Sequence, residues 1–396
     1  MNDDKIKDFH DQENHVVDPD RRAFLKAGAV GACALCFPGL FGVFGSAPPV
    51  QAQTARRGLP GNRRSPWFRN LSGGSVQCTL CPLECRLAPG QRGRCRVREN
   101  RDGTGYTLVY GNPVLVQTDP VERKPFFHVL PGSRALSVST AGCPLHCSFC
   151  EVWDMALAPP EGQYSYELPP AEVIDHAERT GVEAISFAFG EPVAFWEYTC
   201  DTAAEARRAG LLNLVHTSGY INREPLGRIA GHLDAVNVDL KSFDPAFYRS
   251  FCDGELDPVL ETLLFLRREN VHLEITNLLI PTLNDDMAMI RRMCTWIRDN
   301  LGPDVPLHFA RFYPLYKLSN LPPTPVATID RARATAYDAG LNHVYVSRVT
   351  GHEGESTWCP SCGDVVIRRL GFVIEENLLD AGRCGACGTP IPGRWT

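Results

Sequence analysis

Three clusters of closely spaced cysteines constrain this chain more than any other feature of its sequence. The chain has 396 residues and 16 cysteines, and eleven of these cysteines fall into the three clusters. Disulfide frameworks are typical of short secreted chains, whereas clustered cysteines in a long chain are typical of metal ligands. The sequence therefore predicts metal sites at these clusters.

Composition excludes several other classes of protein. Hydrophobic residues make up 44% of the chain and charged residues 22%, which indicates a globular protein rather than a disordered or fibrous one. The length predicts two or three domains of about 100–200 residues each. The 40 basic and 46 acidic residues give a net charge of −6, so we expect no nucleic-acid partner.

Residues 1–52 follow the order of a Tat-type export signal. A twin arginine lies in Asp20–Lys26, an uncharged apolar stretch follows at 27–45, and Val50–Ala52 offers a small-residue cleavage site. Such a signal is an address read by a receptor, so we expect no integral membrane protein after its removal. Because metal sites form as a chain folds, we expect export of the folded, metal-loaded protein to the periplasm, and a cytoplasmic protein if the leader has no function. Cys33 also allows a lipoprotein signal, which would leave a very short apolar region.

The remaining sequence divides into four segments by composition. Residues 53–75 are rich in Arg, Gly and Pro and are predicted to be a linker. A module with four cysteines follows at 76–133, a repeating pattern of strands and helices at 134–350, and a second cysteine-rich module at 356–396.

Short apolar runs alternate with amphipathic stretches through residues 134–350. This alternation is typical of βαβ units around a parallel sheet, so the predicted fold class is α/β. Six units are too few for a complete eight-unit barrel, so we predict a partial TIM-type (β/α)6 barrel, with an open doubly wound sheet as the alternative. The predicted strands are 135–140, 184–189, 213–216, 235–240, 272–279 and 307–312, and the predicted helices include 170–179, 198–209, 258–269 and 286–300.

The first cysteine cluster, Cys143, Cys147 and Cys150, has the spacing C-x3-C-x2-C and directly follows the first predicted strand of the repeating segment. Three thiolates on one short loop can hold three irons of a [4Fe–4S] cluster and leave the fourth iron without a protein ligand. The fourth iron is then a place for a substrate or cofactor. A zinc loop completed by a distant residue is the alternative, with His146 the nearest candidate.

The loop resembles the CxxxCxΦC motif of the radical S-adenosylmethionine (SAM) enzymes, with Phe149 at the aromatic position. Phe189–Pro192 is similar to that family's GGEP motif with Phe in place of the first glycine, and Asp239–Lys241 is similar to the DxK of pyruvate formate-lyase activating enzymes. Each motif falls at the carboxyl end of a predicted strand, where barrel enzymes assemble their sites. The resemblance implies a radical SAM barrel in which the three cysteines bind the [4Fe–4S] cluster and SAM chelates its unique iron. The implied SAM-binding residues are Phe149, Gly190, Glu191, Pro192, Ser218, Asp239, Lys241 and Arg311.

Within this superfamily, the chain resembles the AmmeMemoRadiSam system radical SAM enzyme in three stretches, 78–98, 127–132 and 308–318. Glu151 and Val152 stand where many relatives carry Gln-Asn, on the substrate side of the cluster. This departure puts the identity of the substrate in question.

The resemblance implies reductive cleavage of SAM to a 5′-deoxyadenosyl radical that abstracts hydrogen from a substrate. Similarity to activating enzymes favours a peptide or protein substrate, and no residue is assigned a catalytic role. The implied partners are a reductant such as flavodoxin or ferredoxin and the companion proteins of the AmmeMemoRadiSam system. The alternative is an iron–sulfur and zinc protein that transfers electrons or serves as a scaffold without SAM chemistry.

The second cluster has four cysteines within a short, turn-rich segment. Four such thiolates can close a tetrahedral zinc site or carry an auxiliary iron–sulfur cluster, and a structural site is favoured. The four are Cys78, Cys81, Cys85 and Cys95.

The third cluster forms two CPxCG-like knuckles around a β-rich stretch, a pattern typical of a zinc ribbon. Its members are Cys359, Cys362, Cys384 and Cys387. Three other cysteines stand alone on predicted helices or at their ends and are expected to be small buried side chains. These are Cys200, Cys252 and Cys294.

Overall fold

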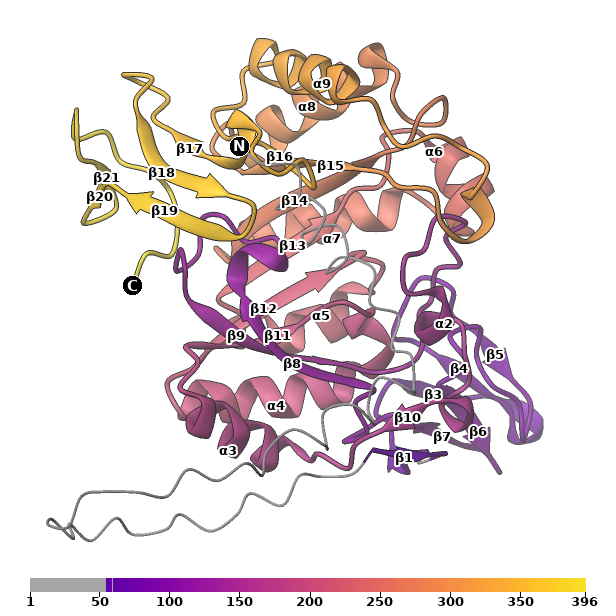
Figure 1. Ribbon diagram of the computed structural model, residues 1–396. Helices are drawn as coiled ribbons and strands as arrows, with labels where there is room; N and C mark the ends of the chain where they lie inside the picture. The colour runs from indigo at the N-terminus through magenta and orange to yellow at the C-terminus, as the bar shows by residue number, and fades with distance from the viewer. Residues whose placement is uncertain (1–54, 59) are drawn as a thin grey trace, which may run out of the picture. The chain divides into compact units, whose positions relative to one another are not determined.

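An eight-stranded, mostly parallel sheet forms the centre of the fold (Figure 1). The structure is a computed structural model that describes residues 55–58 and 60–396, so the predicted leader at 1–52 lies outside the described residues. Neighbouring strands pair in parallel except at one edge, where β8 and β9 are antiparallel. From one edge to the other the strands are β16 (Val344–Ser347), β15 (Leu307–Arg311), β14 (His272–Leu279), β13 (Ala235–Asp239), β12 (Leu212–Thr217), β11 (Ala184–Phe187), β9 (Arg134–Ser139) and β8 (Leu115–Pro120).

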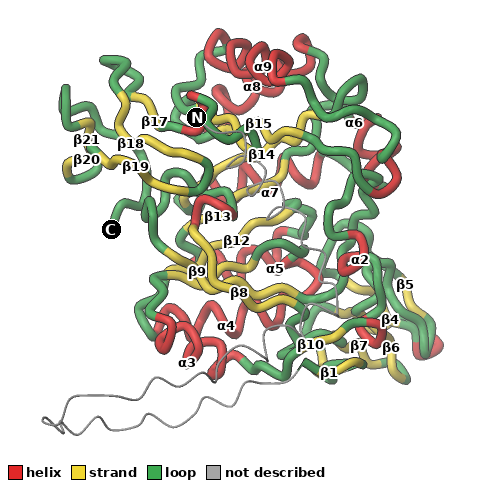
Figure 2. Tube along the Cα trace, viewed as in Figure 1, coloured by secondary structure: helices red, strands yellow, loops and turns green. Residues whose placement is uncertain are grey.

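Helices connect the successive parallel strands and pack against the sheet (Figure 2). Their ends follow local sequence signals. The Asp286 carboxylate accepts hydrogen bonds from backbone amides at the start of α8, and Gly181 ends α3 in the left-handed region at a φ of 61°. Among the described residues, none of the helices is both long and apolar enough to span a membrane. The helices are α2 (Trp153–Ala156), α3 (Pro170–Thr180), α4 (Trp196–Arg208), α5 (Arg223–Ile229), α6 (Pro245–Phe247), a π-helical turn (Tyr248–Cys252), α7 (Asp257–Arg268), α8 (Met287–Leu301) and α9 (Val326–Asp338).

Side chains alternate between the two faces of the sheet along each strand. One face packs against the helices, and we call the opposite face the inner face. In β9, Leu136 and Val138 belong to the main hydrophobic core with the helices, whereas Ala135 belongs to a small separate core. In that small core, Val121, Phe126 and Val129 pack on strand residues from the inner face. The segment 121–132 between β8 and β9 therefore closes the amino end of the inner face, and we call it the floor segment.

The structure confirms the α/β class and all six predicted strands, whose ends shift by one or two residues. The strand order follows the chain without the reversal that defines a doubly wound sheet, so that alternative is excluded. The six-strand prediction omitted two members of the sheet. β16 is only four residues long, and β8 precedes the repeating pattern and pairs antiparallel with β9, so neither has a βα signature of its own.

The N-terminal cysteine-rich module is a pair of small antiparallel sheets, β2–β7–β6 and β3–β4–β5. The predicted linker at 53–75 is wrong over much of its length, because it contributes β1, β2 and β3 to pairings with other strands. Its Arg- and Gly-rich composition is that of a linker, but Trp67 within it is only 5% exposed. The strands are β1 (Arg56–Arg57), β2 (Arg63–Arg64), β3 (Phe68–Asn70), β4 (Val76–Cys78), β5 (Arg86–Leu87), β6 (Arg98–Arg101), β7 (Thr104–Thr107) and, pairing with β1, β10 (Tyr164–Ser165).

The C-terminal module has a three-stranded antiparallel sheet and a short hairpin. Its small core contains Cys359, Val366, Ile367, Cys384 and Ile391. The strands are β17 (Thr357–Trp358), β18 (Val365–Leu370), β19 (Val373–Asn377), β20 (Leu379–Asp380) and β21 (Arg383–Cys384).

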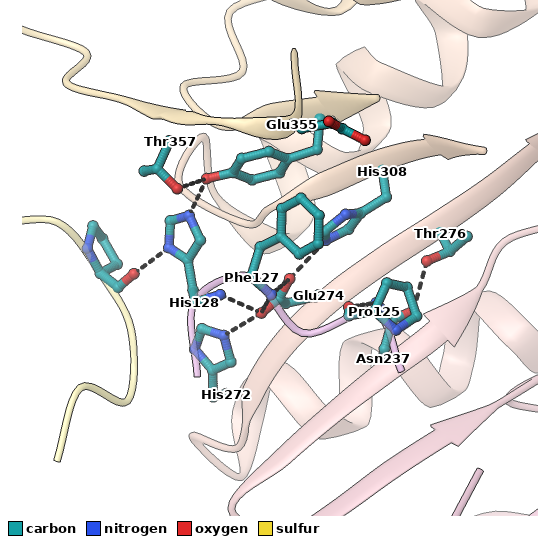
Figure 3. Close-up of polar contacts among 12 residues, drawn as sticks. Pro125, Phe127, His128, Asn237, His272, Glu274, Thr276, His308, Glu355 and Thr357 are labelled. Carbon is teal, nitrogen blue, oxygen red and sulfur yellow. Dashed lines mark hydrogen bonds and ion pairs between the residues drawn. The ribbon is translucent and has the colours of Figure 1, made fainter. Parts of the chain in front are cut away.

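A buried carboxylate on β14 holds the floor segment in place (Figure 3). Glu274 is 0% exposed, and its oxygens accept hydrogen bonds from the backbone amides of Phe127 at 3.1 Å and His128 at 2.9 Å. The imidazoles of His308, at 2.6 Å, and His272, at 3.3 Å, reach the same carboxylate. Burial alone would raise the pKa of Glu274, but the hydrogen bonds from these two rings hold that pKa well below its usual range. Glu274 is therefore an ionised group, and the floor segment supplies two of its donors.

The floor segment also joins the C-terminal module to the sheet. The Nδ1 atom of His128 contacts the Pro392 carbonyl, which makes it the donor and leaves Nε2 to accept from the Tyr345 hydroxyl at 2.6 Å. Backbone bonds run from the Arg394 amide to the His128 carbonyl, at 2.7 Å, and from the Leu130 amide to the Arg394 carbonyl, at 2.8 Å. Removal of the Glu274 carboxylate would therefore weaken the contacts that join the sheet, the floor segment and the C-terminal module.

We expect Glu274→Ala to lower the free energy of unfolding by about 3–5 kcal/mol, because the variant leaves buried donors without their charged acceptor. Urea unfolding followed by circular dichroism measures this difference. Glu261→Ala, at an exposed position of α7, is the matched control and should change stability by less than about 0.5 kcal/mol. Equal effects of the two substitutions would contradict a central role for Glu274.

Candidate functional site

The loop with Cys143, Cys147 and Cys150 follows β9 and is held from two sides. The amides of His146 and Ser148 donate to the carbonyls of Cys252, at 3.0 Å, and Phe251, at 2.7 Å. These two carbonyls belong to the π-helical turn before α7, a kind of element that is frequent at functional sites.

On its other side, this loop packs against the N-terminal module. Gly142 has a φ of 103°, and a Cβ atom there would lie 2.7 Å from Val97 and 3.1 Å from the Cys95 carbonyl. The glycine is therefore required for both conformation and close approach. The N-terminal module thus fixes the position from which the three cysteines project.

A lysine from the end of β13 lies beside the cysteine loop. The Lys241 ammonium is 5.8 Å from the ring centroid of Phe149, which is itself 5% exposed and packs against Phe247. Lys241 pairs with the Asp239 carboxylate at 3.0 Å, and His216 from β12 contacts the same carboxylate at 2.9 Å. Burial alone would raise the pKa of Asp239, but Lys241 and His216 hold that pKa below its usual range. The structure thus brings the predicted residues Phe149, Asp239 and Lys241 together, and it adds His216.

The loop after β11 crosses the end of β9 at Gly190. A Cβ atom there would lie 2.2 Å from the Ser139 hydroxyl and 3.2 Å from the Thr140 carbonyl, so a side chain at this position would have to displace the Ser139 hydroxyl. The preceding Phe189 has a φ of 69°, a left-handed conformation that costs a non-glycine residue about 1–2 kcal/mol. The Phe at the family's first glycine position therefore keeps the backbone conformation of a glycine and is strained by it.

Glu191 connects this loop to the loop after β12. Its carboxylate accepts hydrogen bonds from the Thr217 hydroxyl at 2.6 Å, the Ser218 amide at 2.9 Å and the Val193 amide at 3.1 Å. Pro192 then begins a short 3-10 turn. Glu191 is 6% exposed and its oxygens are engaged within the protein, so it acts on a bound group through the two loops it joins.

Ser218 and Arg311 differ in whether their side chains form hydrogen bonds within the protein. The Ser218 hydroxyl is buried without a hydrogen-bond partner, an arrangement that folded proteins rarely leave without a ligand or water. The Arg311 guanidinium contacts the Thr324 carbonyl at 2.9 Å and the Tyr313 hydroxyl at 3.3 Å, so it is held by the segment after β15. Ser218 is therefore available to a ligand, whereas two of the five N–H donors of Arg311 are engaged within the protein.

The end of β14 supports the loop that carries Lys241. The Asn277 amide donates to the Leu240 carbonyl, and the Asn284 amide donates to the Lys241 carbonyl, both at 2.7 Å. His308 is the second residue of β15, and its ring belongs to the Glu274 network.

Cys252 is the functional neighbour that sequence reasoning missed. It is buried as expected for a lone cysteine, but its thiol forms a hydrogen bond to Cys147 that lowers the pKa of the Cys147 thiol. Its distance along the chain from the cysteine loop hides this contact, because no spacing motif links the two segments. Cys200 and Cys294 lie in α4 and α8, and Cys294 is 0% exposed.

The four cysteines of the N-terminal module are brought into one neighbourhood. Cys78 lies in β4, and its amide donates to the Cys85 carbonyl at 2.9 Å. Burial raises the pKa of Cys81, and the nearby thiols of Cys78, Cys95 and Cys85 raise it further.

The C-terminal module gathers the third cluster most tightly. The sulfur atoms of its four cysteines all lie within 4.8 Å of one another, a set that could hold a metal ion. The sulfur atoms of Cys359 and Cys387 are 3.5 Å apart, and those of Cys362 and Cys384 are 3.8 Å apart. Four soft sulfur donors at such distances fit a tetrahedral ion.

The residues around the first loop fit an iron–sulfur cluster with SAM. Three thiols on one loop match the donor set of a cluster with one open iron. The Ser218 hydroxyl is buried and unpartnered at the end of β12, next to the strand whose loop carries Gly190, so it offers a polar cofactor a hydrogen-bond partner.

Comparisons with known proteins agree with this geometry. A family model described as the radical SAM superfamily matches residues 137–294. The chain is 38% identical over 331 residues to the uncharacterized protein MJ0808 of Methanocaldococcus jannaschii, an alignment that covers 83% of this chain and 98% of that protein.

Two activating enzymes are more distant relatives. The (2S)-3-sulfopropanediol dehydratase activating enzyme of Klebsiella oxytoca is 25% identical over 125 residues, which cover 32% of this chain and 39% of that enzyme. The pyruvate formate-lyase-activating enzyme of Clostridium pasteurianum is 25% identical over 179 residues, which cover 43% of this chain and 71% of that enzyme.

The parallel sheet with its three-cysteine loop defines a radical SAM fold. The chain contains a radical SAM superfamily domain and belongs to the same family as the M. jannaschii protein MJ0808.

We expect Glu191→Ala to weaken SAM binding by at least about tenfold, because two buried amides and a hydroxyl lose their acceptor and both strand-end loops become free to move. Equilibrium dialysis of cluster-loaded protein with labelled SAM measures the affinity. Glu205→Ala on α4, away from these loops, is the control and should bind like the wild type. Unchanged affinity in Glu191→Ala would show that the link between the loops does not shape the site.

Proposed function

We propose that this protein is a radical SAM enzyme in which Cys143, Cys147 and Cys150 hold a [4Fe–4S] cluster. When bound, the cluster and SAM supply a one-electron reductive cleavage that yields methionine and a 5′-deoxyadenosyl radical able to abstract hydrogen from a substrate. The observation that carries the proposal is that the cysteine loop shares one end of the sheet with Gly190, Ser218 and the Asp239–Lys241 pair.

The protein's own residues would bind and orient the cofactor. The backbone at Gly190 and the Ser218 hydroxyl offer contacts at the ends of β11 and β12. Glu191 holds these two loops together through its hydrogen bonds. Lys241 keeps a positive charge beside Phe149, with Asp239 as its counter-charge. Phe149 and Cys147 are almost fully buried, so this side of the loop excludes water.

The alternative function is electron transfer or a scaffold role without SAM chemistry. Such a protein needs an iron–sulfur cluster but does not need a SAM-binding site beside that cluster. The unpartnered Ser218 hydroxyl and the strained Phe189–Gly190 loop favour SAM chemistry over this alternative.

We further propose a peptide or protein substrate and membership of the AmmeMemoRadiSam system, with companion proteins of that system and a flavodoxin- or ferredoxin-type reductant as partners. The activating-enzyme relatives support a macromolecular substrate. Directly after Cys150, Glu151 is paired with Arg348, so the position that distinguishes this chain from many relatives carries an ion pair.

Anaerobically reconstituted protein should form 5′-deoxyadenosine from SAM with dithionite, and Cys147→Ala should reduce this product to the background of the reagents, because the cluster loses a ligand. Liquid chromatography with mass spectrometry quantifies the product. Cys294→Ala, which removes a buried thiol from α8, is the matched control and should retain the activity. A fully loaded wild-type cluster without product would favour the electron-transfer or scaffold alternative.

We propose that the C-terminal four-cysteine site is a zinc ribbon and that the N-terminal four cysteines hold a structural zinc ion or an auxiliary cluster. Cys362→Ala should lose about one equivalent of zinc per chain and keep its iron, because the tetrahedral site is left with three ligands. Elemental analysis by mass spectrometry distinguishes the metals, with Cys200→Ala as the control. Loss of iron in place of zinc would identify the ribbon as an iron site.

We also propose that the leader at 1–52 exports the folded protein. Arg21→Lys with Arg22→Lys should retain the uncleaved protein in the cytoplasm, because the receptor reads the arginine pair. Cell fractionation with immunoblotting measures the distribution. An uncleaved wild-type protein confined to the cytoplasm would show that the leader has no export function.

A further inference from the structure

Two cations at the start of the floor segment share one carboxylate. Arg123 contacts the Asp119 carboxylate at 3.0 Å, and the Lys124 ammonium contacts its other oxygen at 3.3 Å. Gln117 donates to the same group at 2.8 Å. Two cations thus share this carboxylate, and burial lowers the pKa of Lys124 to about 8. The neighbouring Glu122 carboxylate is buried and accepts a hydrogen bond from the Gly132 amide.

These cations lie on the inner face of the sheet. Asp119 and Gln117 pair across the strands with Ala135 and Ser137 of β9, and Ala135 belongs to the core of the inner face. The Lys124 side chain is 0% exposed. The next residue, Pro125, accepts a hydrogen bond at 2.8 Å from Asn237 of β13, as Figure 3 shows.

The cations also face the predicted SAM-binding loop. The ring of Phe189, directly before Gly190, is 5.6 Å from the Arg123 guanidinium carbon and 5.6 Å from the Lys124 ammonium. Such distances allow cation–π attraction, which helps to hold Phe189 in its left-handed conformation. The contact between the floor segment and the cofactor loop therefore places two cations against an aromatic ring.

Solvent reaches this region. The Arg123 side chain is 43% exposed, although the residues on either side of it, Glu122 and Lys124, are buried. Farther along the inner face, Asp239 and His216 keep side-chain exposures of 28% and 24%. A water-soluble group can therefore approach Arg123, and the Lys124 side chain beside it is 0% exposed.

A second observation points to a ligand independently of charge. The hydroxyls of Ser137 in β9 and Ser186 in β11 are buried and have no hydrogen-bond partner, and both residues are 0% exposed. The two serines are cross-strand neighbours on the inner face, because the alternating residues Leu136 and Ile185 belong to the core with the helices. Buried hydroxyls are nearly always hydrogen-bonded in folded proteins, so a missing acceptor is expected beside them.

We propose that Arg123, Lys124, Ser137 and Ser186 form a subsite for an oxyanion group of the substrate, a carboxylate or a phosphate. A guanidinium and an ammonium supply charge-assisted hydrogen bonds, and the serine hydroxyls supply neutral donors to the same kind of acceptor. The inference deepens the proposed function, because the subsite would place a substrate between the floor segment and the cofactor loop.

The experiment titrates cluster-loaded protein with succinate or inorganic phosphate by isothermal calorimetry, at an ionic strength kept constant with chloride. Arg123→Met should weaken binding by at least about tenfold, because a charge-assisted contact is lost. Arg207→Met is the matched control and should bind like the wild type. Arg207 is 47% exposed and contacts the Asp234 carboxylate at 3.0 Å, much as Arg123 contacts Asp119, but it lies on α4.

Ser137→Ala and Ser186→Ala separate a binding role from a structural one. Each substitution removes a buried hydroxyl without a partner, so the ligand-free protein should be as stable as the wild type or more stable, while anion binding becomes weaker. Lower thermal stability with unchanged anion affinity would show that the hydroxyls are structural and would overturn their place in the subsite.

Three further outcomes would overturn the proposal: no anion binding beyond that of chloride, equal binding by Arg123→Met and the wild type, or displacement of the anion by SAM. The last would assign the cations to the carboxylate of the cofactor. Preference for succinate or for phosphate distinguishes the two ligand groups. SAM cleavage is assayed separately, so protein that binds the anion at Arg123 but forms no 5′-deoxyadenosine would refute the proposed function and leave the subsite standing.

Discussion

The ionised carboxylate of Glu274 is the interaction on which the rest of the structure depends. A charge that is 0% exposed is tolerated only when it is paired and hydrogen-bonded, and this one receives donors from the floor segment, β14 and β15. The donors from the floor segment fix its path across the inner face. Through His128, the same path docks the end of the C-terminal module.

The site at the other end of the sheet follows from parallel pairing. Parallel strands bring their carboxyl ends to one edge, so the loops after β9, β11, β12 and β13 meet even though they are far apart in the chain. Direct contacts then set the details. Glu191 joins two of these loops, and Asp239 joins His216 to Lys241. The position of the cysteine loop is set from outside the sheet, by the π-helical turn on one side and the N-terminal module on the other.

Much of this arrangement was predictable because its signals are local. Strand and helix positions follow from apolar periodicity, and the cysteine loop follows from its spacing. The errors arose where pairing is non-local. Residues 56–70 have the composition of a linker but are paired into small sheets, and β8 gains its place in the large sheet only by pairing with β9.

The sequence by itself determined which donor atoms are present and at which strand ends they lie, since both depend on short-range order along the chain. Only the tertiary structure decided that Cys252 touches Cys147, that Glu191 is engaged by two neighbouring loops, and that Arg123 and Lys124 face Phe189 across the inner face. These contacts join segments distant in sequence, and they depend on strand order, register and the path of the floor segment. No local pattern encodes those quantities, because they result from burying all the strands and helices together.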